Sequence, residues 1–226
     1  MCYQQLNNVG IKENLTKIKE QIGSNKVKII VVTKYASFEQ ISEAYNLGIR
    51  DFGESYIQDA LEKISNQDKT LNDPVKWHLI GRLQKNKVKY VLGRFVLIHS
   101  VDSVELAEII NKTALQRNIT QNVLLQVNIS GEESKAGFKK NELVIKFENL
   151  SRLPNIKISG LMTIAPKTED KNMIQNCFLD LADLKGELNN HFKAGLKELS
   201  MGMSNDYQIA IECGSTMLRV GRAIFS

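Results

Sequence analysis

The chain has 226 residues, 42% of them hydrophobic and 24% charged, with a formal net charge of +5; a chain of this size can bury a core without disulfides or metal, and its lysines are too dispersed to indicate a nucleic-acid-binding protein. The three cysteines, Cys2, Cys177 and Cys213, include no C-x-x-C pair, which excludes a disulfide framework and is typical of a reducing compartment. Because the sequence has neither the apolar core of a signal peptide nor the run of about 20 apolar residues that spans a membrane, we expect a cytoplasmic protein.

An amphipathic segment at 3–22 comes first, and short apolar runs then alternate with helix-like segments along the chain. The runs rich in β-branched residues predict eight strands, at 27–33, 49–52, 75–80, 95–99, 122–129, 156–161, 196–200 and 217–221. Seven helices are predicted between them, at 38–48, 55–66, 84–92, 103–117, 140–151, 169–190 and 204–213. The predicted helix N-caps are Ser37, Ser55, Ser103 and Ser204. The stronger strands are mostly apolar, which is typical of strands covered on both faces.

Eight strands that alternate with seven helices predict an α/β fold, a single-domain (β/α)8 TIM barrel over residues 1–226. The sequence ends too soon after the last strand for a full eighth helix, and the segment at 3–22 could fill that place in the outer ring as an extra N-terminal helix. An open doubly wound sheet is the alternative, but no glycine-rich dinucleotide fingerprint follows any predicted strand.

Lys34 directly follows the first predicted strand in the stretch "VVTKYAS". Because the chemistry of a barrel lies at the C-terminal ends of its strands, this side chain can point into the barrel mouth. A partly desolvated amine there can attack a carbonyl group and form a Schiff base. An exposed lysine that caps a strand end is the alternative interpretation.

Small residues follow the seventh and eighth predicted strands, where barrels commonly bind a phosphate. Ser200 ends one strand and is followed by Gly202 and Ser204, and Gly221 and Arg222 follow the other. Glycine-containing turns alone are weak evidence, because many turns between strands and helices use them. Two such turns at the same end of adjacent strands favour a phosphate site.

Arg219 lies inside the last predicted strand, "MLRVG", where alternation could turn it inward. A buried guanidinium stays charged and needs a partner, so a structural salt bridge is one interpretation. A phosphorylated cofactor with an aldehyde would explain Lys34, the phosphate turns and Arg219 together. Pyridoxal 5′-phosphate (PLP) is the candidate.

Seven segments in the same order resemble the pyridoxal phosphate homeostasis protein family, single-domain barrels similar to the N-terminal domain of alanine racemase (fold type III among PLP proteins). They are "VVTKYAS", "FGESYIQDALEK", "WHLIGRLQKNKVKYV", "IHSVDSVELAEIINK", "VLLQVNISGEESKAGF", "ISGLMTIAP" and "LSMGMSNDYQIAIECGSTMLRVGRAIF". The resemblance implies that Lys34 holds PLP as an internal aldimine, that Ser200 and the Gly221–Arg222 turn bind its phosphate, and that Arg219 faces the pyridine nitrogen.

The resemblance also implies a role in keeping free PLP low and supplying it to apo-enzymes. Arginine keeps its proton, so the pyridine nitrogen stays unprotonated and is a weak electron sink. The sequence leaves no room for the second domain that supplies alanine racemase with its second base, so we expect no catalytic turnover and a monomer. A PLP-dependent amino-acid racemase-like enzyme is the alternative function. Two residues depart from the family pattern: Ser55 replaces the usual asparagine, and Arg222 replaces a small hydroxyl residue.

The remaining reactive residues favour ordinary structural roles. His78 and His99 lie in predicted strands, where satisfied core histidines are expected, and His191 is expected at the surface. No two histidines have ligand spacing, so we expect no metal site. Lys135 follows the fifth strand and is either a second, weaker aldehyde site or a solvated loop lysine.

One basic segment, "GRLQKNKVKYVLGR", could be interpreted as an RNA-binding patch. Its basic residues are Arg82, Lys85, Lys87, Lys89 and Arg94. Because it lacks paired aromatic residues and any recognisable module, a solvated helix face is favoured and no nucleic-acid partner is expected. Asn86 and Lys87 belong to a family-like motif without an assigned role.

Overall fold

The eight predicted strands form a closed parallel barrel in the computed structural model, which describes residues 10–67 and 74–226. The strands are β1 (Lys28–Val32), β2 (Asp51–Glu54), β3 (Lys76–Leu79), β4 (Leu97–Val101), β5 (Gln121–Gln126), β6 (Ile156–Met162), β7 (Glu198–Ser200) and β8 (Met217–Val220). They follow one another in sequence order, and β8 pairs in parallel with β1. The (β/α)8 prediction is confirmed, and the open-sheet alternative is wrong.

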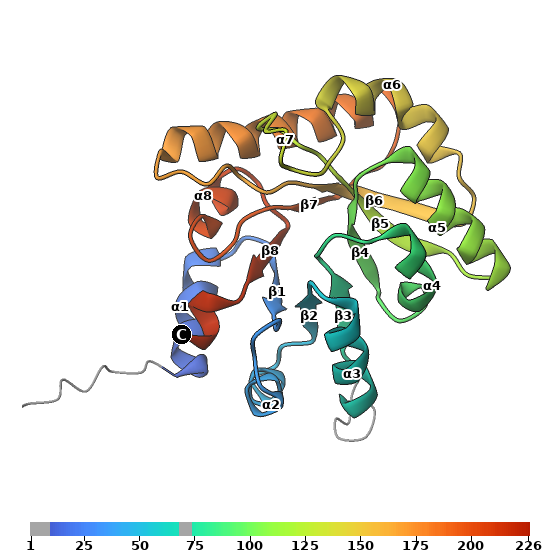
Figure 1. Ribbon diagram of the computed structural model, residues 1–226. Helices are drawn as coiled ribbons and strands as arrows, with labels where there is room; N and C mark the ends of the chain where they lie inside the picture. The colour runs from blue at the N-terminus through green and yellow to red at the C-terminus, as the bar shows by residue number, and fades with distance from the viewer. Residues whose placement is uncertain (1–9, 68–73) are drawn as a thin grey trace, which may run out of the picture.

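Helices surround this barrel on the outside (Figure 1). They are α1 (Ile11–Ile22), α2 (Phe38–Asn46), α3 (Ile57–Gln67), the 3-10 helix η1 (Lys85–Lys87), α4 (Val88–Val91), α5 (Val104–Gln116), α6 (Lys140–Ser151), α7 (Lys171–Phe192), α8 (Tyr207–Glu212) and α9 (Arg222–Phe225). Within the described residues, no helix combines the length and the apolar character needed to cross a membrane.

Two of the four predicted N-caps are confirmed. The hydroxyl oxygens of Ser37 and Ser103 each accept a hydrogen bond from the backbone N–H three residues on, at 3.3 Å. The predictions for Ser55 and Ser204 are wrong, because α3 and α8 begin later, at Ile57 and Tyr207. The Ser204 hydroxyl oxygen instead accepts a hydrogen bond from a backbone N–H of α9.

Helix α1 closes the outer ring beside the C-terminal segment, as predicted for the amphipathic segment. It packs against α2 and the four-residue α9, and the blue α1 lies next to the red end of the chain in Figure 1. The side-chain amide of Asn14 donates to the backbone oxygens of Ile224 and Ser226, each at 3.1 Å. The predicted residues 3–9 of this helix lie outside the described residues, as does Cys2.

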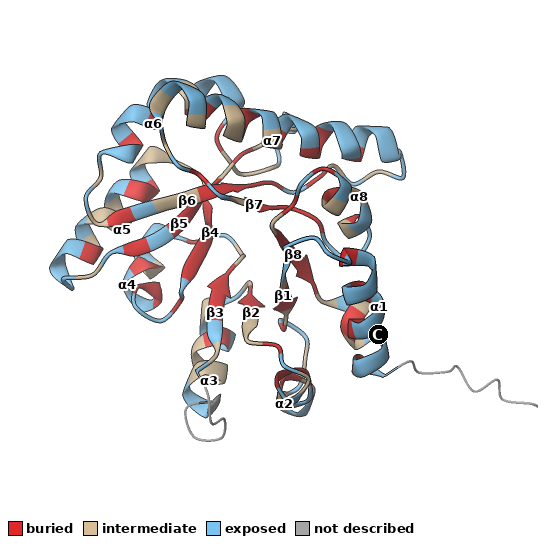
Figure 2. Ribbon diagram, turned by 180° about the vertical axis from the view of Figure 1, so that it is seen from behind, coloured by how far each residue is buried: buried red, intermediate tan, exposed pale blue. Residues whose placement is uncertain are grey.

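The strands are the most buried part of the molecule (Figure 2). The main apolar core lies between the strands and the helices. A separate small cluster consists of Ile30, Leu97, Leu124, Met162 and Met217. Buried polar side chains also occur in the strands, including His78, His99, Ser200 and Arg219. Of these four, Arg219 lines the cavity at the mouth of the barrel.

Candidate functional site

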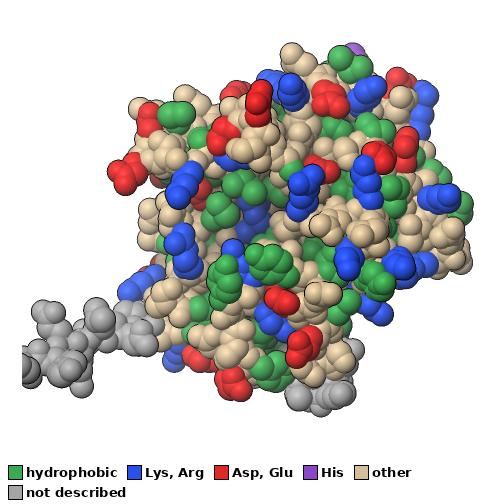
Figure 3. Space-filling model, in the orientation of Figure 1, with side chains coloured by type: hydrophobic (Ala, Val, Ile, Leu, Met, Phe, Trp, Pro, Cys, Tyr) green, Lys and Arg blue, Asp and Glu red, His purple; other side chains and the backbone are tan. Residues whose placement is uncertain are grey.

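The C-terminal ends of the strands surround a cavity of about 750 Å³. Its lining includes six cationic side chains, Lys34, Arg82, Lys135, Lys167, Arg219 and Arg222. Asp206 is the one carboxylate among the described lining residues. Lys and Arg side chains border the hollowed centre of the face drawn in Figure 3. This excess of positive charge favours an anionic ligand.

Lys34 lies at the mouth of this cavity, as predicted. It lies two residues after the end of β1 and lines the cavity together with Val32, because alternate residues of an extended segment share a face. Its side chain is exposed, with Nζ 5.0 Å from the ring centroid of Tyr35. An amine in this position can reach a carbonyl group in the cavity.

The backbone just before Lys34 is held by a buried polar contact. The Thr33 hydroxyl donates to Glu54 Oε1 at 2.6 Å, and Lys63 Nζ of α3 donates both to this carboxylate oxygen and to the Thr33 carbonyl, each at 2.6 Å. Thr33 and Glu54 are fully buried. The three residues therefore fix the end of β1 against β2 and α3.

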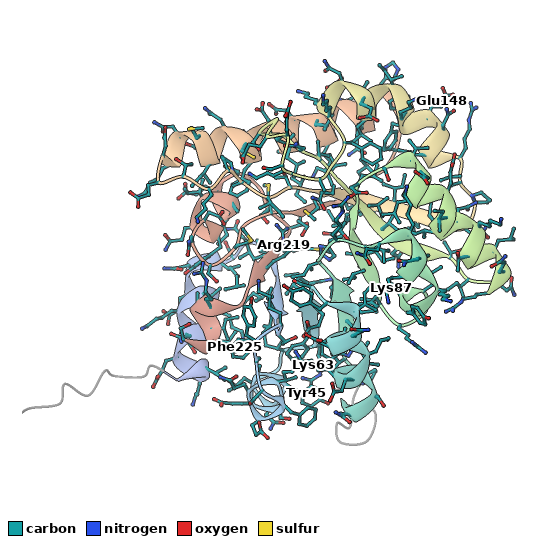
Figure 4. All side chains as sticks on the ribbon, in the orientation of Figure 1. Tyr45, Lys63, Lys87, Glu148, Arg219 and Phe225 are labelled. Carbon is teal, nitrogen blue, oxygen red and sulfur yellow. The ribbon has the colours of Figure 1, made fainter. Side chains whose placement is uncertain are left out.

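Arg219 forms part of the cavity wall from inside the barrel and lies near the centre of Figure 4, among the strands. Its side chain is buried and donates hydrogen bonds to Ser200 Oγ at 2.6 Å and to the Thr163 carbonyl at 2.8 Å. Burial lowers the pKa of the guanidinium to about 10, against the opposing effect of Asp206. No ion pair of Arg219 occurs among the described residues, so the salt-bridge interpretation gains no support.

Ser200 lies inside the barrel, and the phosphate contact predicted for it stays a prediction. Its side chain is fully buried and is absent from the cavity lining. Its hydroxyl oxygen accepts the hydrogen bond from Arg219 and also lies 2.8 Å from His99 Nδ1. The hydroxyl is therefore occupied inside the barrel, and Ser204 is the serine of this segment that lines the cavity.

The turns after β7 and β8 come together at the cavity. Ser204, Gly221 and Arg222 all line it, and Ser204 Oγ accepts a hydrogen bond from the backbone N–H of Ala223 at 3.1 Å. A Cβ atom at Gly221 would lie 2.9 Å from the backbone oxygen of Val32. Glycine therefore allows β8 to end against β1, beside Lys34.

The sequence analysis missed a row of hydrogen-bonded side chains across the barrel interior. His78 Nε2 lies 2.9 Å from Asp51 Oδ1, His78 Nδ1 lies 2.9 Å from His99 Nε2, and His99 continues the row to Ser200 and Arg219. The prediction of satisfied core histidines is confirmed, and His191 is exposed as expected. The described residues contain no group of His, Cys, Asp or Glu suited to a metal ion.

The other singled-out residues divide between the cavity and the surface. Ser55 and Lys135 line the cavity. Lys135 Nζ bonds to Glu132 Oε1 at 2.7 Å and to the Ala165 carbonyl at 3.1 Å, so it ties two loops together. Lys87 is absent from the cavity lining and lies outside the strands in Figure 4.

Comparison with known proteins identifies the family. The profile of the family described as "Alanine racemase, N-terminal domain" matches residues 7–226. The pyridoxal phosphate homeostasis proteins of Aquifex aeolicus and Synechocystis sp. are each 41% identical to the chain. These matches cover 94% and 88% of the chain and 96% and 90% of the two relatives. The chain belongs to the pyridoxal phosphate homeostasis protein family.

Solved structures agree with this assignment. This member of the pyridoxal phosphate homeostasis protein family is 34% identical to PipY of Synechococcus elongatus PCC7942, whose structure contains bound PLP. The TM-score is 0.88, over 96% of this chain and 100% of PipY. Alanine racemase from Clostridium difficile 630 has a TM-score of 0.76 at 16% identity, over 95% of this chain and 55% of the racemase. That second likeness shows a shared barrel fold alone.

Proposed function

We propose that the chain binds PLP, holds it reversibly on Lys34 and supplies it to apo-enzymes as part of vitamin B6 homeostasis, without catalytic turnover of its own. The observation that carries the proposal is the position of Lys34 and the buried Arg219 on one strongly cationic cavity. The names of the curated relatives and the PLP bound in PipY support the same assignment.

The residues of the cavity fit the chemical groups of PLP. When bound, PLP supplies an aldehyde that condenses reversibly with a primary amine, releasing water, and a phosphate that carries negative charge. Lys34 provides the amine, and Thr33 fixes the backbone from which it projects. Arg222, with the Ser204 and Gly221 turns beside it, provides the positive side of a phosphate site. Arg219 has five N–H donors, two of which are used in the barrel, so others remain to face a ring nitrogen.

The absence of turnover is supported by the side chains around the cavity. Racemisation by two bases needs a second acid–base group opposite the lysine. None of the described lining residues is a histidine, cysteine or tyrosine, and the carboxylate among them, Asp206, accepts a hydrogen bond from the Met203 backbone N–H. Tyr35 and Tyr56 are 80% and 55% exposed and are absent from the lining. Lys135 is engaged with Glu132 and a backbone carbonyl.

We further propose one domain over residues 1–226 that works as a cytoplasmic monomer. The pairing of β1 with β8 and the packing of α1 on α9 support a single domain. The buried free thiols of Cys177 and Cys213 support a reducing compartment. An exposed Lys34 at an open mouth supports transfer of the ligand to another protein.

The proposal is tested by adding PLP, reducing the adduct with borohydride and mapping the modified peptide. Lys34 should carry the added mass, Lys34→Ala should abolish both the added mass and the visible absorbance, and the matched Lys135→Ala should retain them. An adduct at Lys135, or one unaffected by Lys34→Ala, would overturn the assignment. Exchange of an amino-acid α-hydrogen in deuterated water well above that with free PLP would establish the racemase-like alternative.

A further inference from the structure

Five polar side chains form one continuous row through the barrel interior. Asp51 of β2, His78 of β3 and His99 of β4 lie on one side, and Ser200 of β7 and Arg219 of β8 lie on the other. The four links measure 2.9, 2.9, 2.8 and 2.6 Å in that order. The row leads from the cavity wall, at Arg219, to the start of β2, where the Asp51 side chain is 15% exposed.

The two ends of the row fix its outer hydrogen bonds, and the protonation of the two histidines fixes the inner ones. Arg219 can only donate, so Ser200 Oγ accepts. An ionised Asp51 can only accept, so the neighbouring His78 Nε2 must carry a proton. If His78 is neutral, its Nδ1 accepts from His99 Nε2–H. If His99 is also neutral, its Nδ1 accepts from the Ser200 hydroxyl. Every link is then made once, with both imidazoles protonated on Nε2.

The opposite arrangement needs one more proton in the barrel. With the proton of His99 on Nδ1, that nitrogen donates to Ser200 and the His99 Nε2 accepts from His78. His78 must then be doubly protonated in order to donate to Asp51 as well. The Ser200 oxygen would accept two hydrogen bonds, and its own O–H would lose the acceptor at His99.

The charges around the row favour the neutral histidines. Burial lowers the pKa of His99 well below its ordinary value, and His78, Arg219 and Lys28 add to the effect. Burial also lowers the pKa of His78 in spite of Asp51, with Lys28 of β1 and Lys76 of β3 acting in the same direction. At the far end, burial raises the pKa of Asp51, but His78, Lys28 and Lys76 outweigh it and leave the pKa lowered.

We propose that Ser200, His99 and His78 are positioning residues that hold Arg219 through a one-way chain of hydrogen bonds ending at Asp51. Arg219 donates to Ser200 through Nη1 and to the Thr163 carbonyl through Nη2. The remaining N–H groups are thereby oriented toward the cavity. The role of Arg219 toward a ligand rests on the proposed PLP binding, whereas the direction of the hydrogen-bond chain does not.

The direction is tested without any ligand, by histidine tautomers. Protein labelled with 15N-histidine gives three ring patterns in a long-range 1H–15N correlation spectrum, because the sequence has three histidines; His191→Gln identifies the exposed one. Near neutral pH, His78 and His99 should both be neutral and protonated on Nε2. A wild-type ring that is protonated on Nδ1 or doubly protonated would overturn the proposal.

The positioning role is tested by the matched pair Ser200→Ala and Ser200→Thr in the full chain with PLP. Ser200→Ala removes a hydrogen bond to a charged group and should weaken PLP binding about tenfold, whereas Ser200→Thr keeps the hydroxyl and should restore it. The adduct at Lys34 should persist in both. Equal affinity in Ser200→Ala and wild type, or no rescue by threonine, would overturn the role. If the wild type failed to bind PLP, the proposed function would fall, and the tautomers would still decide the direction of the chain.

Discussion

Acid should destabilise the protein through the two histidines of the barrel interior. Burial lowers the pKa of His99 well below 6.5, with contributions from His78, Arg219 and Lys28, and burial also lowers the pKa of His78. On unfolding, each ring regains its ordinary pKa. Below about pH 6.5 the unfolded chain therefore binds protons that the folded chain does not. The free energy of unfolding decreases as the pH is lowered. The loss stops at each folded pKa, where the folded protein takes up the proton too.

The size of this effect follows from proton linkage. One proton bound only by the unfolded state changes the free energy of unfolding by about 1.4 kcal/mol per pH unit. A histidine that stays neutral in the folded protein should lower the free energy of unfolding by about 2 kcal/mol between pH 7 and pH 5. His99, with the larger shift, should contribute close to this amount, and His78 should add a smaller one because Asp51 opposes its shift. Against a total stability of about 5–15 kcal/mol, the loss is readily measured.

The measurement is a series of urea unfolding curves between pH 7 and pH 5. His99→Gln removes one of the responsible groups, so its free energy of unfolding should vary less with pH than that of the wild type, whatever its absolute stability. His191→Gln is the matched control, because an exposed ring meets solvent in both states. A wild-type stability that stays flat over this range, or a His99→Gln variant with the full wild-type slope, would refute the reasoning.

Two further predictions concern stability. Lys63→Met should lower the free energy of unfolding by about 3–5 kcal/mol, because it leaves the fully buried carboxylate of Glu54 without its cation. Arg152→Met, which breaks an exposed ion pair, should lower it by less than about 1 kcal/mol. Equal losses in urea unfolding would contradict the first estimate. Gly160→Ala should cost about 3 kcal/mol because its Cβ would clash with the backbone of β7, whereas Gly186→Ala, in α7 with open space around it, should stabilise by about 0.5–1 kcal/mol in thermal melts.

The barrel was predictable because burial on both faces leaves a strong local pattern. All eight predicted strands exist, and the largest boundary difference is at β5, which ends at Gln126 instead of 129; β2 begins at Asp51 instead of 49. Ile49 there is apolar and buried, but it precedes the strand. The N-caps were less predictable, because a cap depends on the path of the loop. The Ser204 hydroxyl pairs with the backbone of Ala223, a contact that no local pattern of residues indicates.

The site was predictable where the topology alone decides the position. Lys34, Gly221 and Arg222 follow strand ends, so a barrel necessarily brings them to one mouth. Ser200 differs because it is the last residue of its strand, and its orientation decides whether it meets the cavity or the interior. The row through His78 and His99 also depends on barrel closure, which brings β4 and β7 within hydrogen-bond distance. A signal was nevertheless present, since these are polar residues in otherwise apolar strands.

The direction of the interior chain and the proposed carrier role depend on the same property of Arg219, its retained proton. With a pKa of about 10, the guanidinium stays charged at neutral pH despite its burial. A guanidinium has hydrogen-bond donors and no acceptor, so Arg219 donates to Ser200 and to any other partner. A ring nitrogen that meets Arg219 therefore always meets a donor that does not transfer its proton. An unprotonated pyridine withdraws electrons weakly, so a site built in this way favours holding PLP over breaking bonds with it.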